Sequence, residues 1–225
     1  HYLHFFFLGG PDFVVGPTAP AAERNILGVI AKVGLDIAGK VIRLRRECRN
    51  LIQTMTGKVI HPVFGLPGGV SRGLSEAERK EFLKTTEFAI EFSEFALNLF
   101  DDVVLKNPAY VDLILNDAYA HQTNYMGLVD ENNKVNFYDG PVRVVNPSGD
   151  EIAKFAPQQY TDHIGEHVEP WSYITFPYLK KIGWKGFVDG PDSGVVRSAP
   201  LARCNVADGM ATPLAQASYE RMYET

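Results

Sequence analysis

The segment SEAERKEFLKTTEFAIEFSEFALNLF, residues 75–100, decides the fold more than any other part of the chain. At its start, Ser75 and Glu78 have the spacing of a capping box, in which each side chain binds the other residue's backbone N–H. Large apolar side chains follow on more than one face of the expected helix: Phe82, Phe88, Phe92, Phe95, Leu97, Leu99 and Phe100. The pattern predicts a long helix that is covered by protein on several sides, as in a bundle.

Two further helices are predicted on either side of this segment. Apolar residues recur in steps of three and four from Ile26 to Met55, and Gly57 supplies a stop, which predicts one long amphipathic helix. After the capped helix, Pro108 permits a short helix through Leu115. The first half of the chain, about 1–117, is therefore expected to be a helical bundle.

The periodicity changes toward two in the middle of the chain. The stretches 135–138 and 142–145 predict strands, and Asp139-Gly140 and residues 147–150 predict turns. We expect a small antiparallel β meander at about 122–156. The remainder, 157–225, is expected to be irregular with short helices, at about 157–168 and at 213–223. The predicted fold class is mainly α, of the α+β type, in one domain with subregions.

Composition narrows the function classes. The chain has 225 residues, a net charge of −5 and two cysteines. No basic stripe with interleaved aromatics is present, so nucleic acid is not an expected partner. No apolar run approaches the roughly 20 residues that span a bilayer, so a soluble chain is expected. Two cysteines are too few for a disulfide framework, and a reducing compartment fits them best.

Two short motifs suggest hydrolytic chemistry. GVSRG at 69–73 matches a nucleophile elbow, but no strand leads directly into Ser71, as such an elbow requires. HIGEH at 163–167 matches an inverted zinc-peptidase pattern, in which His163 and His167 share a helix face and Glu166 acts as base. Gly165 weakens that helix and no third ligand motif follows, so a zinc metallopeptidase is a minor alternative. The glycine-rich loop at 65–69 lacks the lysine step of a phosphate-binding P-loop.

Four longer blocks, in order, resemble one family, the large subunits of nickel-iron hydrogenases, particularly the soluble cytoplasmic types. The blocks are HYLHFF (1–6) with PDF (11–13), GKVIHP (57–62) with PGGV (67–70), EHVEPWSY (166–173) with FPYLK (176–180), and PLAR (200–203) with NV (205–206). The resemblance covers nearly the whole chain, which it identifies as the central part of such a large subunit.

The resemblance implies that the complete enzyme splits or forms H2 at a Ni-Fe centre. Electrons would pass to an iron-sulfur small subunit, then to further electron-transfer subunits, in the cytoplasm. The family holds its metals with two cysteine pairs, and neither pair occurs in this chain. Cys48 and Cys204 are therefore expected to be buried apolar cysteines rather than ligands, and truncation is the expected reason for the absent pairs.

Without those cysteines, no metal ligand or cofactor-binding residue is assigned, and the chain alone is expected to be inactive. The residues closest to the chemistry would surround the metal ligands and control protons. The candidates are His61, then His1 and His4, with Arg203 as a candidate cation. One rival remains from another class, a metal-free relative in a quinone-linked subunit of the respiratory complex I type.

Overall fold

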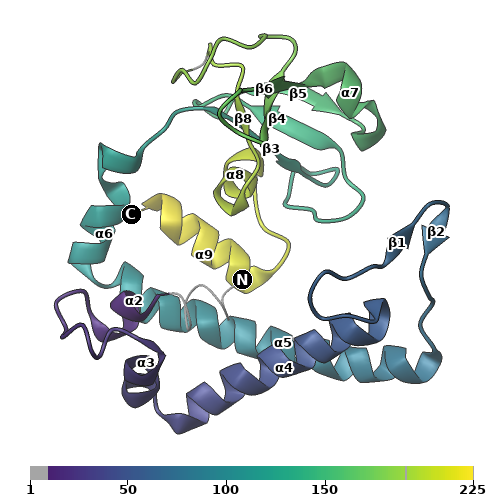
Figure 1. Ribbon diagram of the computed structural model, residues 1–225. Coiled ribbons are helices and arrows are strands. Elements are labelled where there is room, and N and C mark those ends of the chain that lie inside the picture. Colours follow the sequence, from purple (N-terminus) through teal and green to yellow (C-terminus); the bar gives the residue numbers. More distant parts are fainter. Residues whose placement is uncertain (1–9, 191, 225) are drawn as a thin grey trace. The chain divides into compact units, whose positions relative to one another are not determined.

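A computed structural model describes residues 10–190 and 192–224 of the chain, which divides into two compact units, His1–Leu115 and Asn116–Thr225 (Figure 1). The helical part was expected to end at about residue 117. Both helices and strands are present, so the α+β class is confirmed. The first unit is mainly helical, and the second carries the larger sheet.

The first unit consists of helices and one small hairpin. Its elements are α2 (Pro11–Val15), α3 (Ile26–Val33), α4 (Leu35–Thr56), β1 (Gly65–Leu66), β2 (Gly69–Val70), α5 (Glu76–Phe100), the π-helical turn η1 (Asp101–Leu105) and α6 (Pro108–Leu115). The two long helices α4 and α5 run antiparallel, with the β1–β2 hairpin in the connection between them (Figure 1). The predicted pair of long helices is therefore present.

Helix α5 begins as the sequence predicts. The Ser75 side chain accepts a hydrogen bond from the Glu78 backbone N–H, and the Glu78 carboxylate accepts one from the Ser75 N–H at 2.8 Å. Arg72 adds an ion pair to Glu78 at 2.7 Å. The hydrogen bonds from Ser75 and Arg72 lower the pKa of Glu78 to about 2. The capping box thus fixes the start of the longest helix in the unit.

The long helix expected from Ile26 to Met55 is interrupted, and this prediction was wrong in one respect. Gly34 has φ 90° and ψ 158°, which is not a helical conformation, and it separates α3 from α4. The apolar periodicity continues across Gly34, so the pattern gave no indication of the break. Glycine tolerates a positive φ at little steric cost, which makes it the natural residue for this corner.

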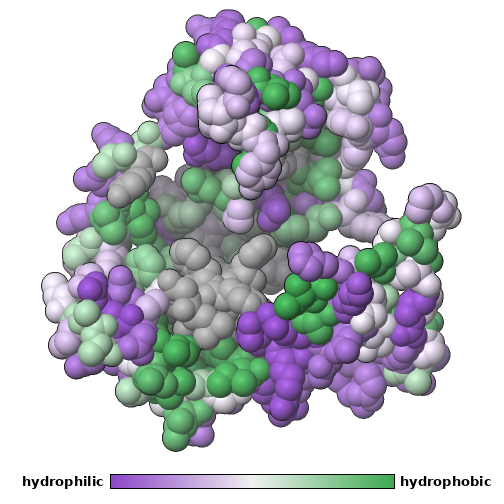
Figure 2. Space-filling view, in the orientation of Figure 1, coloured by the Kyte–Doolittle hydropathy of each residue, from purple (hydrophilic) through white to green (hydrophobic). Residues whose placement is uncertain are grey.

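The core of the first unit lies where α2, α3, α4, α5 and α6 meet. Its buried members are Val14, Val29, Val41, Leu44, Phe92, Ala96, Val104 and Tyr110. The Tyr110 hydroxyl donates to the Asp12 carbonyl at 2.9 Å, which ties α6 to α2. Many other large apolar side chains of the unit remain exposed, among them Leu27, Leu35 and Ile42. Figure 2 shows apolar surface over α3 and the start of α4.

The second unit contains a mixed sheet, a two-stranded sheet and short helices. Its elements are the 3-10 turn η2 (Asp117–Tyr119), β3 (Asn124–Leu128), β4 (Val142–Val145), β5 (Glu151–Phe155), the 3-10 turn η3 (Pro157–Gln159), α7 (Tyr160–His163), β6 (Ile164–Val168), β7 (Thr175–Leu179), β8 (Val196–Arg197), α8 (Pro200–Val206) and α9 (Pro213–Glu224). Strands β5, β4 and β3 pair antiparallel in that order, and β8 joins β3 in parallel. The expected meander is confirmed, with β8 as an addition.

Two local predictions in this unit were wrong. Residues 135–138 alternate like a strand, but only Val135 makes an isolated bridge, and the rest form a loop. The Asn136 side-chain oxygen accepts a hydrogen bond from the Tyr138 N–H at 2.9 Å. A side chain therefore satisfies a backbone group that a neighbouring strand would otherwise bind. The helix expected over 157–168 is one short helix, α7, followed by strand β6. The last helix, α9, begins at Pro213 as predicted.

Candidate functional site

His61, the leading candidate, lies in the connection between α4 and the β1–β2 hairpin. Its backbone has φ 53°, a left-handed conformation that is uncommon outside glycine, and its side chain is exposed. Within the described part of the chain, its imidazole makes no hydrogen bond. His1 and His4 lie outside the described residues. His61 belongs to the first unit, whereas Arg203 belongs to the second.

Arg203 lies on α8, which packs against strand β3. Gly127 on β3 makes this packing possible, because a Cβ at that position would lie 2.8 Å from Val206 Cγ2 and 3.5 Å from Arg203 Cγ. The Arg203 guanidinium stands over the Phe137 ring at 4.6 Å from its centroid. An arginine is attracted to an aromatic face by the ring quadrupole. Arg203 is thus a cation held at the surface by an aromatic ring.

The loop that carries Phe137 is braced by its own side chains. Asn136 Nδ2 donates to Asp139 Oδ1 at 3.1 Å, and the Asn136 N–H donates to the Leu128 carbonyl at 3.2 Å. Gly140 closes the loop against β3, where a Cβ would come within 1.8 Å of the Val129 carbonyl oxygen. Only glycine fits there. The loop therefore has one well-defined path beside α8.

A buried arginine, Arg143, ties α8 to the sheet. Its side chain donates to Glu151 at 2.9 Å, to Asp208 at 2.7 Å and to the Val206 carbonyl at 2.8 Å. Burial works against the charge, but the hydrogen bonds and charges of Asp208 and Glu151 leave the pKa of Arg143 raised. The hydrogen bond from Arg143 holds the pKa of Asp208 below its usual value. The end of α8 is thereby fixed to β4 and β5.

Two tyrosine hydroxyls of α9 bond to α8 and to the residue that follows it. The Tyr219 hydroxyl donates to the Ala207 carbonyl at 2.9 Å, and the Tyr223 hydroxyl donates to Asn205 Oδ1 at 2.8 Å. Burial raises the pKa of Tyr223 and of the Cys204 thiol. Cys204 therefore stays a protonated, partly buried side chain of α8, as a packing cysteine does.

The zinc-peptidase interpretation is contradicted by the geometry. His163 ends α7 and His167 lies on strand β6, so the two imidazoles do not share a helix face. The His163 ring stacks on Phe155 at 4.1 Å, and the His167 ring stacks on Trp184 at 4.0 Å. His167 Nε2 also lies 2.9 Å from Glu169 Oε1. Both histidines have structural contacts instead of a shared ligand position.

The nucleophile-elbow interpretation fails as well. Ser71 follows β2 of a tight antiparallel hairpin, and residues 71–75 separate that strand from α5, so the sharp strand-to-helix turn of an elbow is not formed. Pro67 and Gly68 form the hairpin turn, where Gly68 has φ 83°. The glycine-rich loop at 65–69 is therefore used for a turn.

The residues of this chain do not fit a nickel-iron centre or an iron-sulfur cluster. Such groups need several thiolates, and the two cysteines, Cys48 on α4 and Cys204 on α8, lie in different units. Burial raises the pKa of both thiols, which disfavours the thiolate. Among the residues that the structure describes, no three His, Cys, Asp or Glu side chains are grouped to hold a metal ion.

Sequence reasoning missed two polar sites of the second unit. Arg143 carried a signal, because a charged residue interrupts the apolar strand Val142-Arg143-Val144-Val145 and had to find buried partners. The second is His121, which lies 2.6 Å from Asp189 Oδ1 through Nε2 and 3.0 Å from Arg197 Nη2 through Nδ1. No short motif joins these three residues, so nothing in the sequence indicated their contact.

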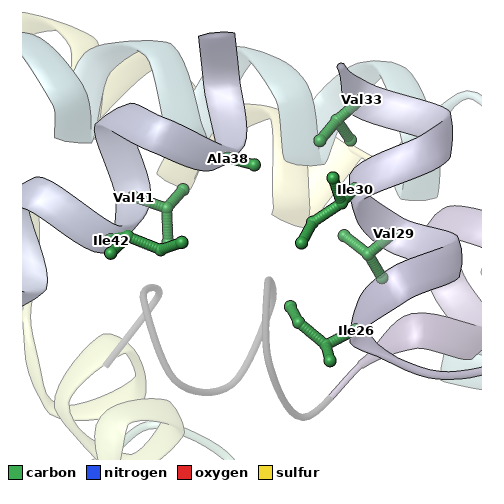
Figure 3. Close-up of a pocket in the computed structure, with 7 residues that line it drawn as sticks. All are labelled: Ile26, Val29, Ile30, Val33, Ala38, Val41 and Ile42. Carbon is green, nitrogen blue, oxygen red and sulfur yellow. The ribbon is translucent and has the colours of Figure 1, made fainter. Parts of the chain in front are cut away.

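One apolar cavity lies within the first unit. It has a volume of about 130 Å³ and is lined by aliphatic side chains of α3 and α4: Ile26, Val29, Ile30, Val33, Ala38, Val41 and Ile42. Figure 3 shows the two sets of side chains facing each other across it. Among the described residues its lining is aliphatic, with no polar group that would orient a ligand.

The described residues define the class of the protein: an α+β chain in which buried polar side chains such as Arg143 fix neighbouring elements to one another. No helix among the described residues is long and apolar enough to cross a lipid bilayer. No model of a known protein family matches the chain.

Curated proteins that resemble the chain narrow this class. The chain is 44% identical over its full length to an iron-sulfur subunit of the F420-non-reducing hydrogenase of Archaeoglobus profundus, covering 46% of that protein. It is 41% identical to a vhu subunit of the F420-non-reducing hydrogenase of Methanococcus voltae, covering 100% of this chain and 50% of the relative. The NAD-reducing hydrogenase HoxS subunit beta of Cupriavidus necator is 35% identical, with 99% and 44% covered. The chain thus spans about half the length of these relatives.

Solved structures agree with these relatives. A crystal structure of an NAD+-reducing [NiFe]-hydrogenase in the H2-reduced state matches with a TM-score of 0.76 and 30% identity, over 98% of this chain and 47% of that one. A [NiFeSe]-hydrogenase of Dm. baculatum shares the fold, with a TM-score of 0.56 at 17% identity over 99% and 50% of the two chains. The chain is therefore related to proteins of nickel-iron hydrogenase complexes.

The names of the relatives correct one expectation. A fragment of a large subunit was expected, but the relative from Archaeoglobus profundus is named an iron-sulfur subunit, and none of the three names describes a large one. The assignment to the large subunit is therefore not retained. The expectation that an iron-sulfur small subunit is the partner falls with it.

Proposed function

We propose that this chain forms part of a subunit of a nickel-iron hydrogenase, whose complete enzyme oxidises or forms H2. The observation that carries the proposal is the 44% identity to a hydrogenase subunit over the whole chain. The likeness to the solved NAD+-reducing enzyme, with a TM-score of 0.76, supports it. Within this proposal the chain contributes structure to the enzyme, because Arg143 and the close packing at Gly127 fix α8 to the sheet.

The chemistry of the complete enzyme is supplied by metal centres that other residues hold. Within this proposal, Arg143 and Arg203 act on the structure, and His61 acts on protons. Arg143 fixes α8 to the sheet, and α8 presents Arg203 at the surface. His61 remains a proposed proton-handling residue, because its imidazole is exposed and makes no hydrogen bond within the described residues.

A segment exchange tests the proposal. The part of HoxS subunit beta that aligns with this chain is replaced by residues 1–225, since 99% of the chain aligns with that relative at 35% identity. We expect the chimera to co-purify with the other HoxS subunits and to contain as much nickel as the parent enzyme. The 225-residue chain expressed alone, as control, is expected to bind no stoichiometric nickel. A chimera that folds but neither assembles nor gains nickel would contradict the proposal.

A further inference from the structure

We propose that Phe137, Tyr138 and Arg203 form a docking surface for another subunit of the hydrogenase, and that the docked segment carries an acidic side chain beside an apolar one. The inference rests on the proposed function, because it names a partner of the same assembly. On the second unit, Arg203 contacts Phe137 where the loop after β3 meets α8, and Tyr138 is the next residue of that loop.

Two adjacent aromatic side chains are unusually exposed at this place. Phe137 is 72% exposed and Tyr138 is 90% exposed. Exposed aromatic side chains beside an arginine match the composition of interface centres, where Tyr, Phe and Arg are enriched and contribute most of the binding energy. The pair therefore has the chemistry of an anchor rather than of an ordinary solvated loop.

The loop is already held in the shape that a partner would meet. Asn136 bonds the Tyr138 N–H, the Asp139 carboxylate and the Leu128 carbonyl, and Gly140 packs directly on the Val129 carbonyl. An anchor on a braced loop loses little conformational freedom on binding, which favours affinity.

The charge at the surface defines the partner's chemistry. Within the described part of the chain, no carboxylate pairs with Arg203, and its guanidinium contacts the Phe137 ring. Arg143, by contrast, is matched by Glu151 and Asp208. A guanidinium has five donors in a planar fork that suits a carboxylate. A docked carboxylate would give Arg203 the charged partner that it lacks within the described residues.

Space for a docked segment lies beside Tyr138. A groove with a volume of about 660 Å³ begins at this side chain and is lined further by Asp139, Gly140, Pro141, Ala156, Pro157 and Gln158. The groove combines proline and tyrosine surfaces with the polar side chains of Asp139 and Gln158, so an extended segment finds both apolar and hydrogen-bonding contacts. The partner would place its apolar side chain against Tyr138 and its carboxylate at Arg203.

Photo-crosslinking tests the position of the surface. The full chain, carrying benzoylphenylalanine in place of Tyr138, is co-expressed with the other hydrogenase subunits of its own host, and the assembled complex is irradiated. We expect a crosslink to one of those subunits, identified by mass spectrometry. The same replacement at Tyr173, which is 98% exposed, is the matched control. Tyr138→Ala should weaken binding between the subunits at least about tenfold, and Tyr173→Ala should not.

Zero-length crosslinking tests whether a carboxylate of the partner contacts residue 203. Arg203→Lys keeps the cation and introduces an amine that a carbodiimide joins to a carboxylate in direct contact. We expect a new isopeptide between residue 203 and an Asp or Glu of the other subunit, which the wild-type complex lacks. Crosslinks from positions 138 and 203 only to a second copy of this chain, or no more at 138 than at 173, would overturn the inference.

The outcomes separate this inference from the proposed function. If the complex assembles but positions 138 and 203 give no link to another subunit, the docking surface is wrong and the proposed function stands. If no complex forms with any hydrogenase subunit, the docking surface is wrong, and if the HoxS chimera also fails to assemble, the proposed function is wrong as well.

Discussion

Arg143 shows how one residue can organise the surroundings of a site. It is only 8% exposed, and its three hydrogen bonds reach β5, the end of α8 and the residue two positions beyond α8. Removing one partner of a buried charge pair costs more than the pair contributes, because the remaining charges are left uncompensated. Arg203, which lies on α8 itself, is only half-buried. The first arginine fixes the helix, and the second is available to a partner.

Arg143→Ala is expected to destabilise the second unit by about 3 kcal/mol, since Glu151 and Asp208 lose their counter-charge. Urea unfolding followed by tryptophan fluorescence measures this, because Trp171 and Trp184 both lie in that unit. Lys134→Ala, which removes an exposed cation, is the control and should change stability by less than about 0.5 kcal/mol.

The Arg143–Asp208 pair also makes the stability of the second unit depend on pH in the acid range. Arg143 holds the pKa of Asp208 below its usual 3.8, so the stabilisation is present above that value and is lost as the pH falls through the lower folded pKa. The difference between wild type and Arg143→Ala should shrink below pH 3.8. Equal stability of the two proteins at neutral pH would refute the role assigned to Arg143.

At the scale of elements, α5 is the best-specified part of the fold. Its capping box places the Glu78 carboxylate against the Ser75 N–H and the Arg72 guanidinium, which lowers the pKa of Glu78 to about 2. The cap is therefore complete above the ordinary glutamate pKa of 4.5 and weakens as the pH falls toward 2. The long helix keeps its start wherever Glu78 is ionised.

Ser75→Ala should cost about 1 kcal/mol of local stability, because the Glu78 N–H loses its acceptor. Hydrogen exchange of the first-turn amides of α5 measures the loss. Ser71→Ala is the matched control, since the Ser71 side chain lies in the hairpin and makes no hydrogen bond within the described residues. Equal protection in the two variants would show that the cap does not hold the helix start.

Local signals in the sequence were enough to predict the elements that carry them. The capping box located α5, the apolar period located α4, and turn residues bounded the meander. Gly34, by contrast, breaks a helix whose apolar period continues across it. Residues 135–138 alternate like a strand, but Asn136 diverts them into a loop. The stacking of Arg203 on Phe137 joins residues far apart in sequence, so only the folded sheet reveals it.

For the whole molecule, the proposed role follows from what the chain contains. It spans about half of its hydrogenase relatives, and its two cysteines lie singly in separate units. Its resemblance to nickel-iron hydrogenases was visible from four sequence blocks, whereas the relatives' names contradict the expected large subunit. The family signal resides in motifs along the chain, and the type of subunit depends on features that those motifs do not contain.

The most direct test of this account is H2-dependent reduction of NAD+ by the HoxS chimera that carries residues 1–225 in its beta subunit. The account predicts NADH formation under H2 by the assembled chimera, and none by an assembly from which the segment is deleted. An assembled, nickel-containing chimera that forms no NADH, beside an active parent enzyme, would contradict the claim that this chain is a working part of a hydrogenase subunit.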